Sequence, residues 1–146
     1  MRFLLACLAF VFALSIAAPT SAQGFPPGPW RGVWTNSGQY EYQAELDFTM
    51  ELSGRVVGQI RWMLVRSPRH EEQVKIGLRG VEYVEGAFDA QTGALTLRGT
   101  RLDDPHQILG ADEYRLVVSP DGQYIAGLTA NNGTWLGRVE LTRFGP

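Results

Sequence analysis

Apolar and polar residues alternate without a break from Tyr40 to Leu52. The even-numbered positions carry Tyr, Ala, Leu, Phe and Met, whereas the odd-numbered positions carry Glu, Gln, Asp and Thr. Side chains of a β-strand point alternately to its two faces, whereas an α-helix would scatter both sets around its axis. The segment therefore predicts a strand with one buried face, and it favours an all-β fold.

The same alternation, interrupted by turns rich in Gly, Pro, Asn and Asp, predicts strands along the rest of the chain. The expected strands are Trp30–Thr35, Tyr40–Leu52, Arg55–Arg66, Gln73–Asp89, Ala94–Arg101, Glu113–Ser119, Tyr124–Thr129 and Thr134–Arg143. About eight antiparallel strands in chain order favour an all-β, up-and-down barrel. A two-sheet β-sandwich is the alternative.

The inward face of these strands defines the expected core. Its members are Leu46, Phe48, Ile60, Ile76, Leu78, Leu95, Leu97, Leu116, Val139 and Leu141. The opposite face carries many charges, among them Glu45, Asp47, Arg61 and Arg98. A barrel of the bacterial outer membrane needs an apolar outer face, so the pattern excludes that class.

The first 22 residues have the features of a secretory signal peptide. Arg2 precedes an apolar run from Phe3 to Ala18, and small residues follow up to the expected cleavage. The run is shorter than the roughly 20 residues of a membrane helix, and no second run follows, so we expect no membrane span. Residues 23–29 are rich in Gly and Pro and predict a tether, and residues 30–146 predict a single β-barrel domain.

The composition of the expected mature chain indicates its cellular compartment and excludes one class of partner. Cys7 is the only cysteine and lies in the leader, so no disulfide is expected. A cysteine-free exported domain favours a secreted protein of a bacterial periplasm. Removing the leader leaves 12 basic residues against 15 acidic ones, a net charge of −3. That balance argues against nucleic acid as a partner.

The connections between the expected strands differ between the two ends of the barrel. The turns after the second, fourth and sixth strands are tight, whereas both long loops, residues 67–72 and 102–112, follow odd-numbered strands. Successive connections of an up-and-down barrel alternate between its ends. The longer connections therefore share one end, which we call the long-loop end, and His70 and His106 lie there. Small barrels bind ligands at their mouths, so this end is the expected binding site.

The inward residues nearest to this mouth are aromatic, and the loops around it are polar. The candidate ligand-binding residues are Trp34, Asn36, Tyr40, Tyr42, Trp62, Tyr114, Asn132 and Trp135. Their rings can stack on a small planar molecule or a glycan, while the amides orient it. An eight-stranded barrel is only just wide enough for its own side chains, so a filled barrel is the alternative.

The loop from Leu102 to Asp112 has the signals of a lid over the mouth. Asp104 can cap a short helical turn, with Gln107 at the capping-box position. Such a turn directs Ile108 and Leu109 inward. Asp104 is then a structural residue rather than a ligand-binding one.

Glu82 is a charged residue in the inward phase of the fourth expected strand. A bulge at Gly80–Val81 would turn it outward. If it points inward, Arg101 or a ligand must satisfy its carboxylate, because an unpaired buried charge is costly.

Acidic and imidazole side chains of the long loops favour an alternative, a metal site at the long-loop end. A metal site there would draw on His106, Asp103, Asp104, Asp112, His70 and Glu71, although their spacing follows no regular ligand motif. That hypothesis makes the protein a loop-borne, metal-dependent hydrolase. No nucleophile elbow, zinc-protease helix motif, phosphate loop or dinucleotide fingerprint is present, so we expect neither catalytic residues nor a cofactor.

The opening strand carries a resemblance to a known group of barrels. Trp30–Asn36 reads Trp-Arg-Gly-Val-Trp-Thr-Asn and resembles the first Gly-x-Trp strand of avidins and related calycin barrels. Residues Trp135–Phe144 are similar to the closing strand of avidins. The resemblance implies a barrel with a ligand in its mouth, and it places Asn36 on an asparagine that contacts biotin in avidins. Ile60 stands where the third avidin strand has a tyrosine.

Turn residues and strand glycines resemble a second family, the small exported bacterial β-domains that also occur attached to caspase-like proteins. The similar segments are Gly86–Asp89, Thr92–Leu95, Asp104–Pro105, Leu116 and Gly127. This resemblance implies a fold and export rather than a reaction. Our main hypothesis is a secreted, non-catalytic module that binds a small molecule or glycan at the long-loop end. A structural or protein-interaction module with a filled barrel is the alternative.

Overall fold

The computed structural model describes residues 25–144, except Pro27, Asn132 and the side chain of Trp135. The expected signal peptide, residues 1–22, lies outside the described residues.

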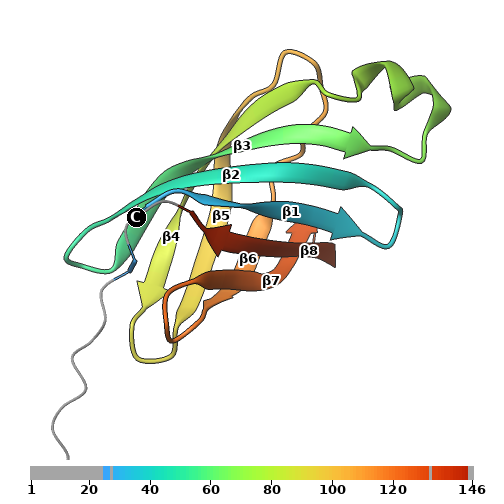
Figure 1. The fold of residues 1–146 in the computed structure, drawn as a ribbon. Coiled ribbons are helices and arrows are strands. Elements are labelled where there is room, and N and C mark those ends of the chain that lie inside the picture. Colours follow the sequence, from blue (N-terminus) through green and yellow to red (C-terminus); the bar gives the residue numbers. More distant parts are fainter. Residues whose placement is uncertain (1–24, 27, 132, 145–146) are drawn as a thin grey trace, which may run out of the picture.

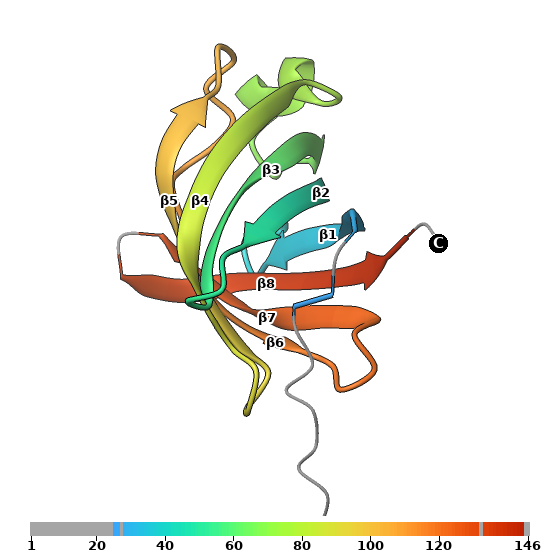
Figure 2. The same cartoon turned by 90° about the vertical axis from the view of Figure 1, so that its left-hand side faces the viewer.

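Eight strands in the described part of the chain form one closed barrel (Figure 1). The strands are β1 (Trp30–Asn36), β2 (Glu41–Met50), β3 (Arg55–Arg66), β4 (Arg79–Asp89), β5 (Ala94–Asp103), β6 (Glu113–Val118), β7 (Tyr124–Asn131) and β8 (Thr134–Arg143). Each strand pairs antiparallel with the next, and β1 closes the barrel against β8. Figure 2 shows the strands around the barrel in chain order. The prediction of an all-β, up-and-down barrel is confirmed.

The predicted start of the fourth strand is wrong. Residues His70–Lys75 form a 3₁₀ helix, η1, and Val74 and Ile76 are 85% and 43% exposed instead of buried. The amide of Gly77 bonds to the carbonyl of Leu64, 2.8 Å away, close to the end of β3. A strand that began at Gln73 would therefore extend beyond its neighbour, with no partner for its backbone groups. The length of β3, rather than the local alternation, sets where β4 begins.

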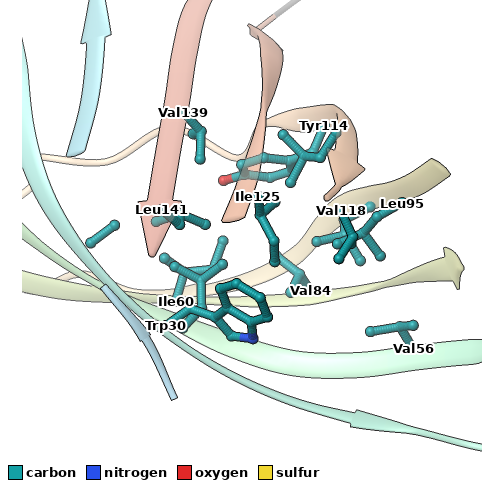
Figure 3. Packing of buried hydrophobic residues seen from close by; sticks show 14 of the residues in the cluster. Trp30, Val56, Ile60, Val84, Leu95, Tyr114, Val118, Ile125, Val139 and Leu141 are labelled. Carbon is teal, nitrogen blue, oxygen red and sulfur yellow. The ribbon is translucent and has the colours of Figure 1, made fainter. Parts of the chain in front are cut away.

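Apolar side chains pack together inside the barrel (Figure 3). They fill the end that carries the connections after β2, β4 and β6, which we call the tight-turn end. Seven of the ten expected core residues are buried, Phe48 and Leu78 are half-buried, and Ile76 is exposed. Phe25, from the segment expected to be a tether, is also buried. Its ring lies 5.2 Å from that of Phe88 and 5.9 Å from that of Phe48. The chain before β1 thus closes the tight-turn end of the barrel.

Two glycines allow neighbouring strands to approach more closely than side chains permit. A Cβ atom at Gly86 would lie 1.8 Å from the carbonyl oxygen of Thr96, and one at Gly32 would lie 1.9 Å from that of Glu140. No side chain fits at either distance, so the tight coiling of β4 against β5 and of β1 against β8 depends on glycine.

Candidate functional site

The four connections at the long-loop end are residues 37–40, 67–78 and 104–112 and the short link between β7 and β8, as the strand order requires. Figure 1 shows η1 and the β1–β2 connection at this end and the β2–β3 turn at the opposite end. The amine of Lys75 donates a hydrogen bond to the carbonyl of Gln107, 3.0 Å away, and so joins the two long loops. The prediction that His70 and His106 share one end is confirmed.

A cavity of about 220 Å³ opens at the long-loop end, and we call it the mouth cavity. Its lining residues are Trp34, Asn36, Tyr42, Trp62, Glu82, Ile108, Leu109, Gly110, Asp112, Thr129, Asn131, Thr134, Leu136 and Gly137. Four of the candidate binding residues are among them: Trp34, Asn36, Tyr42 and Trp62. The barrel is thus packed at one end and hollow at the other.

Three aromatic rings from β1, β2 and β3 form one wall of the mouth cavity. The ring centroids of Trp34 and Tyr42 are 5.5 Å apart, and those of Tyr42 and Trp62 are 6.1 Å apart. Both pairs meet edge to face, the arrangement that aromatic quadrupoles prefer. Alternation along three adjacent strands places the rings together, which is why the sequence pattern could identify them.

The polar atom of each ring is held by a different part of the barrel. The indole N–H of Trp34 donates to Thr129 Oγ1 at 2.7 Å, and the hydroxyl of Tyr42 donates to the carbonyl of Ile108 at 2.6 Å. Gly137 makes the first bond sterically feasible, because a Cβ there would lie 2.5 Å from the indole nitrogen of Trp34. The third indole N–H, that of Trp62, donates to Glu82 Oε2 at 3.2 Å. These bonds fix the wall before any ligand arrives.

Glu82 points into the barrel, so the expectation that a bulge turns it outward is wrong. Its side chain is 1% exposed and lies at the floor of the mouth cavity. The irregularity in β4 falls between Tyr83 and Val84, after Glu82, and therefore does not reverse its direction. Arg101, the partner considered for an inward Glu82, instead places its guanidinium 3.7 Å from the ring centroid of Tyr83.

Three donors satisfy the Glu82 carboxyl group. The hydroxyl of Tyr114 and the indole N–H of Trp62 donate to Oε2, and the backbone N–H of Asp112 donates to Oε1 at 2.9 Å. The pKa of Glu82 is raised to about 7: burial and the nearby Asp112 carboxyl raise it, and the three donors lower it. Gly99 leaves room for this group, because a Cβ there would lie 2.2 Å from Glu82 Oε1.

Asp112 is a second acid in the cavity lining. Burial raises its pKa, while hydrogen bonds from Asn131 and Thr129 lower it. The amide Nδ2 of Asn131 lies 3.1 Å from Asp112 Oδ1. The sequence pattern indicates Asp112 only as a possible metal ligand and does not indicate Asn131 as a cavity residue. Asp112 lies in the connection before β6 and Asn131 is the last residue of β7, so the alternation within the strands does not predict where their side chains point.

The remaining candidate binding residues lie elsewhere. Tyr114 is buried beneath Glu82 and serves as its hydrogen-bond donor rather than as cavity wall. Tyr40 precedes β2 and packs at the rim, with the guanidinium of Arg69 6.0 Å from its ring centroid. Trp135 pairs with Ala130 through its backbone, and its side chain lies outside the described residues, as does all of Asn132.

Asp104 organises the loop that covers the mouth cavity. Its Oδ2 accepts hydrogen bonds from the backbone N–H groups of Ile108 and Leu109, both at 2.7 Å. The predicted structural role of Asp104 and the inward direction of the two apolar residues are confirmed. The predicted helical turn is wrong, because Gln107 has a positive φ of 54° and the segment folds as a non-helical turn.

Replacing Asp104 with Ala should loosen this lid without unfolding the barrel. The substitution removes a charged acceptor from two backbone amides, a loss of about 1–3 kcal/mol of local stability. Amide hydrogen exchange at Ile108 and Leu109 should accelerate at least about tenfold, while the amides of the barrel strands keep their protection. Asp103→Ala removes the neighbouring exposed carboxylate and is the matched control, for which no acceleration is expected. Equal exchange in both variants would contradict the assigned role.

Among the described residues, no three His, Cys, Asp or Glu side chains lie close enough together to hold a metal ion. No helix in the described part of the chain is both long and apolar enough to cross a membrane. No protein-family model matches the sequence, and a search of curated proteins finds no similar one.

Proposed function

We propose that this protein is an exported, non-catalytic binding module that holds a small planar molecule in the mouth cavity. The observation that carries the proposal is a 220 Å³ cavity with a pre-arranged aromatic wall, in a barrel whose other end is packed. Export to a bacterial periplasm is part of the proposal: residues 1–22 support export, and the absence of cysteine after Cys7 supports the periplasm.

The volume supports a ligand of modest size. A cavity of about 150 Å³ in another protein accommodates benzene. The mouth cavity therefore suits a substituted ring or a bicyclic ring of about ten non-hydrogen atoms. A single sugar ring is of comparable size, whereas a longer glycan would extend past the lid residues Ile108 and Leu109.

The chemistry of the lining supports binding rather than turnover. The described residues around the mouth cavity include no Ser, Cys, His or Lys, and the Glu82 carboxyl, which could act as a base, already accepts three hydrogen bonds. Asn36 and Asn131 lie in the lining and offer amides that can orient a polar substituent. The hydroxyl of Thr129 is already occupied by the indole of Trp34.

An interaction module is the second candidate, and an exposed apolar surface favours it. Val117, Tyr124 and Leu128 are 57%, 57% and 49% exposed. Val117 pairs with Ala126, between the other two along β7, so the three lie on one outer face of β6 and β7. Such a face can bind a protein while the mouth cavity plays no part.

The proposal is tested by binding of small molecules to the purified protein. Tryptophan fluorescence and thermal stability should be followed with a panel of neutral and charged heteroaromatic molecules and of monosaccharides. A ligand of the mouth cavity should change the fluorescence and raise the melting temperature. Trp62→Ala should weaken binding at least about tenfold, because it removes part of the wall. Trp62→Phe keeps a ring and is the matched control.

Circular dichroism should show that both Trp62 variants are folded. Binding that is unchanged in Trp62→Ala would place the ligand outside the mouth cavity. The absence of any response across the panel would favour the interaction module, and Val117→Lys combined with Leu128→Lys would then be the variant to test for partner binding.

A further inference from the structure

Among the described residues that line the mouth cavity, every ionisable side chain is an acid. Glu82 and Asp112 contribute carboxyl groups, Tyr42 contributes a phenol, and no Arg, Lys or His belongs to this described lining. Arg31 and Arg55 pair with acids of the outer face, Glu45 and Glu85, and Arg69 pairs with Glu72 of η1. Lys75, at the rim, bonds to the carbonyl of Gln107. A ligand in this cavity therefore meets negative charge without a competing cation.

The floor of the cavity has hydrogen-bond capacity left for a ligand. The two carboxyl oxygens of Glu82 offer about four acceptor positions, and the described residues fill three of them. Each of these three donors is neutral: a hydroxyl, an indole and a backbone amide. The Glu82 carboxyl is thus well oriented but has no counter-ion among the groups that contact it.

Two neighbouring acids that are shielded from water, with no cation beside them, are an unfavourable arrangement. Glu82 is buried, Asp112 is half-buried, and the Asp112 carboxyl raises the pKa of Glu82. A protein reduces this unfavourable energy either by keeping a proton on one of the acids or by binding a cation between them. The aromatic wall of Trp34, Tyr42 and Trp62 favours the second solution, because the faces of these rings attract cations.

We infer that the mouth cavity is selective for small organic cations, such as amidinium or ammonium compounds, whose charged group lies against Glu82 and Asp112 between the aromatic rings. The inference rests on the proposed binding function and adds the charge of the ligand to it. A hydrated inorganic cation would leave the apolar walls unused, whereas an organic cation presents a planar or apolar body to Trp34 and Trp62.

The test compares three molecules of matched size and shape: benzamidinium, benzamide and benzoate. Affinities should be measured by calorimetry with the purified protein at about pH 8, where Glu82 is expected to be ionised. Benzamidinium should bind at least about tenfold more tightly than benzamide, and benzoate should not bind measurably. Benzamide binding as tightly as benzamidinium would overturn the inference and leave the proposed binding function intact. No binding of any molecule, in this set or the larger panel, would overturn both.

Two variants locate the charge selectivity. Glu82→Gln should reduce benzamidinium affinity at least about tenfold and reduce benzamide affinity less, so that the preference for the charged molecule is lost. Glu85→Gln removes an acid from the outer face of the same strand and is the matched control, with no change expected for either molecule. Equal benzamidinium affinities in the two variants would overturn the assignment to Glu82.

The pH dependence of wild-type binding keeps the inference testable if Glu82→Gln does not fold. The titratable groups that face Glu82 are Asp112, ahead of β6, and Tyr114, on β6, with Tyr42 on the cavity wall. Both tyrosines stay neutral, because burial raises their pKa. Benzamidinium affinity should rise several-fold from about pH 5 to about pH 8 as the acids ionise, while benzamide affinity stays flat. Parallel pH profiles for the two molecules would overturn the inference.

Discussion

Replacing Trp30 with Ala is expected to lower the free energy of unfolding by about 3–5 kcal/mol. Trp30 is 0% exposed at the start of β1, where its ring centroid lies 6.3 Å from that of Phe25. Removing the indole leaves a cavity that the closed barrel cannot collapse, because every strand is held on both sides. Equilibrium denaturation monitored by circular dichroism measures the change.

Trp30→Phe provides the control for the same site. The indole N–H of Trp30 is buried and has no hydrogen-bond partner in the described part of the chain. Phe keeps most of the ring volume and removes that unpaired donor, so the two effects partly cancel and a loss of about 1–2 kcal/mol or less is expected. A Trp30→Ala variant as stable as Trp30→Phe would contradict the packing assigned to the tight-turn end.

The second large effect is a loss of stability with rising pH that Glu82 causes. Its pKa is about 7 in the folded protein and about 4.3 in an unfolded chain. At a pH between these two values the folded protein binds more protons than the unfolded chain does. The free energy of unfolding therefore falls as the pH rises. The stabilisation by protonated Glu82 is complete at a pH below its pKa in the unfolded chain. It is lost as the pH rises through its pKa in the folded protein. The expected total is about 3 kcal/mol between about pH 4 and pH 8.

Glu82→Gln should abolish most of this slope. The pH slope, rather than the stability at one pH, is the informative quantity, because the single oxygen of the Gln side chain cannot accept hydrogen bonds from all three donors of Glu82. The Asp112 carboxyl remains in the variant and retains a smaller slope of the same sign, since burial raises its pKa too. Glu85 has a lowered pKa because of Arg98, so Glu85→Gln should not remove the slope. Parallel curves for wild type and Glu82→Gln would contradict the burial of this acid.

Much of the fold could be predicted from the sequence, because a strand with one buried face alternates apolar and polar residues, and this alternation can be read from the strand's own residues. Arg55–Arg66 and Thr134–Arg143 were predicted with the bounds that β3 and β8 have in the structure. The predicted fourth strand starts too early, because Val74 and Ile76 continue the period into a segment that has no strand partner. Strand bounds depend on neighbours that lie far away in the sequence.

The candidate site could be predicted in outline for a similar reason. Trp34, Tyr42 and Trp62 alternate in phase on adjacent strands, so their convergence follows from the strand order. The sequence does not predict the inward direction of Glu82, because burying an acid is favourable only when hydrogen-bond donors surround it, and these donors come from elsewhere in the chain. Tyr114 and the backbone of Asp112 are 32 and 30 residues away in the sequence. The sequence does not predict the burial of Phe25, because its segment is rich in Gly and Pro and shows no alternation of apolar and polar residues.

The resemblance of Trp30–Asn36 to the opening strand of avidins stays a prediction. The structure places Asn36 in the cavity lining, where its Oδ1 accepts the backbone N–H of Tyr40 at 3.0 Å. That bond holds the β1–β2 connection and occupies one acceptor position of the side chain. Asn36 is therefore a structural residue of the rim that also faces the proposed ligand.

The central claim is that the long-loop end binds a small molecule while the opposite end stays packed, and the indole N–H signals in a nitrogen–proton correlation spectrum test it most directly. Trp34 and Trp62 line the mouth cavity, whereas Trp30 is buried at the tight-turn end. Titration with benzamidinium or benzamide should shift the signals of Trp34 and Trp62 and leave that of Trp30 in place. Signals of Trp34 and Trp62 that stay fixed at saturating concentrations of both molecules, or a shift confined to Trp30, would contradict the account.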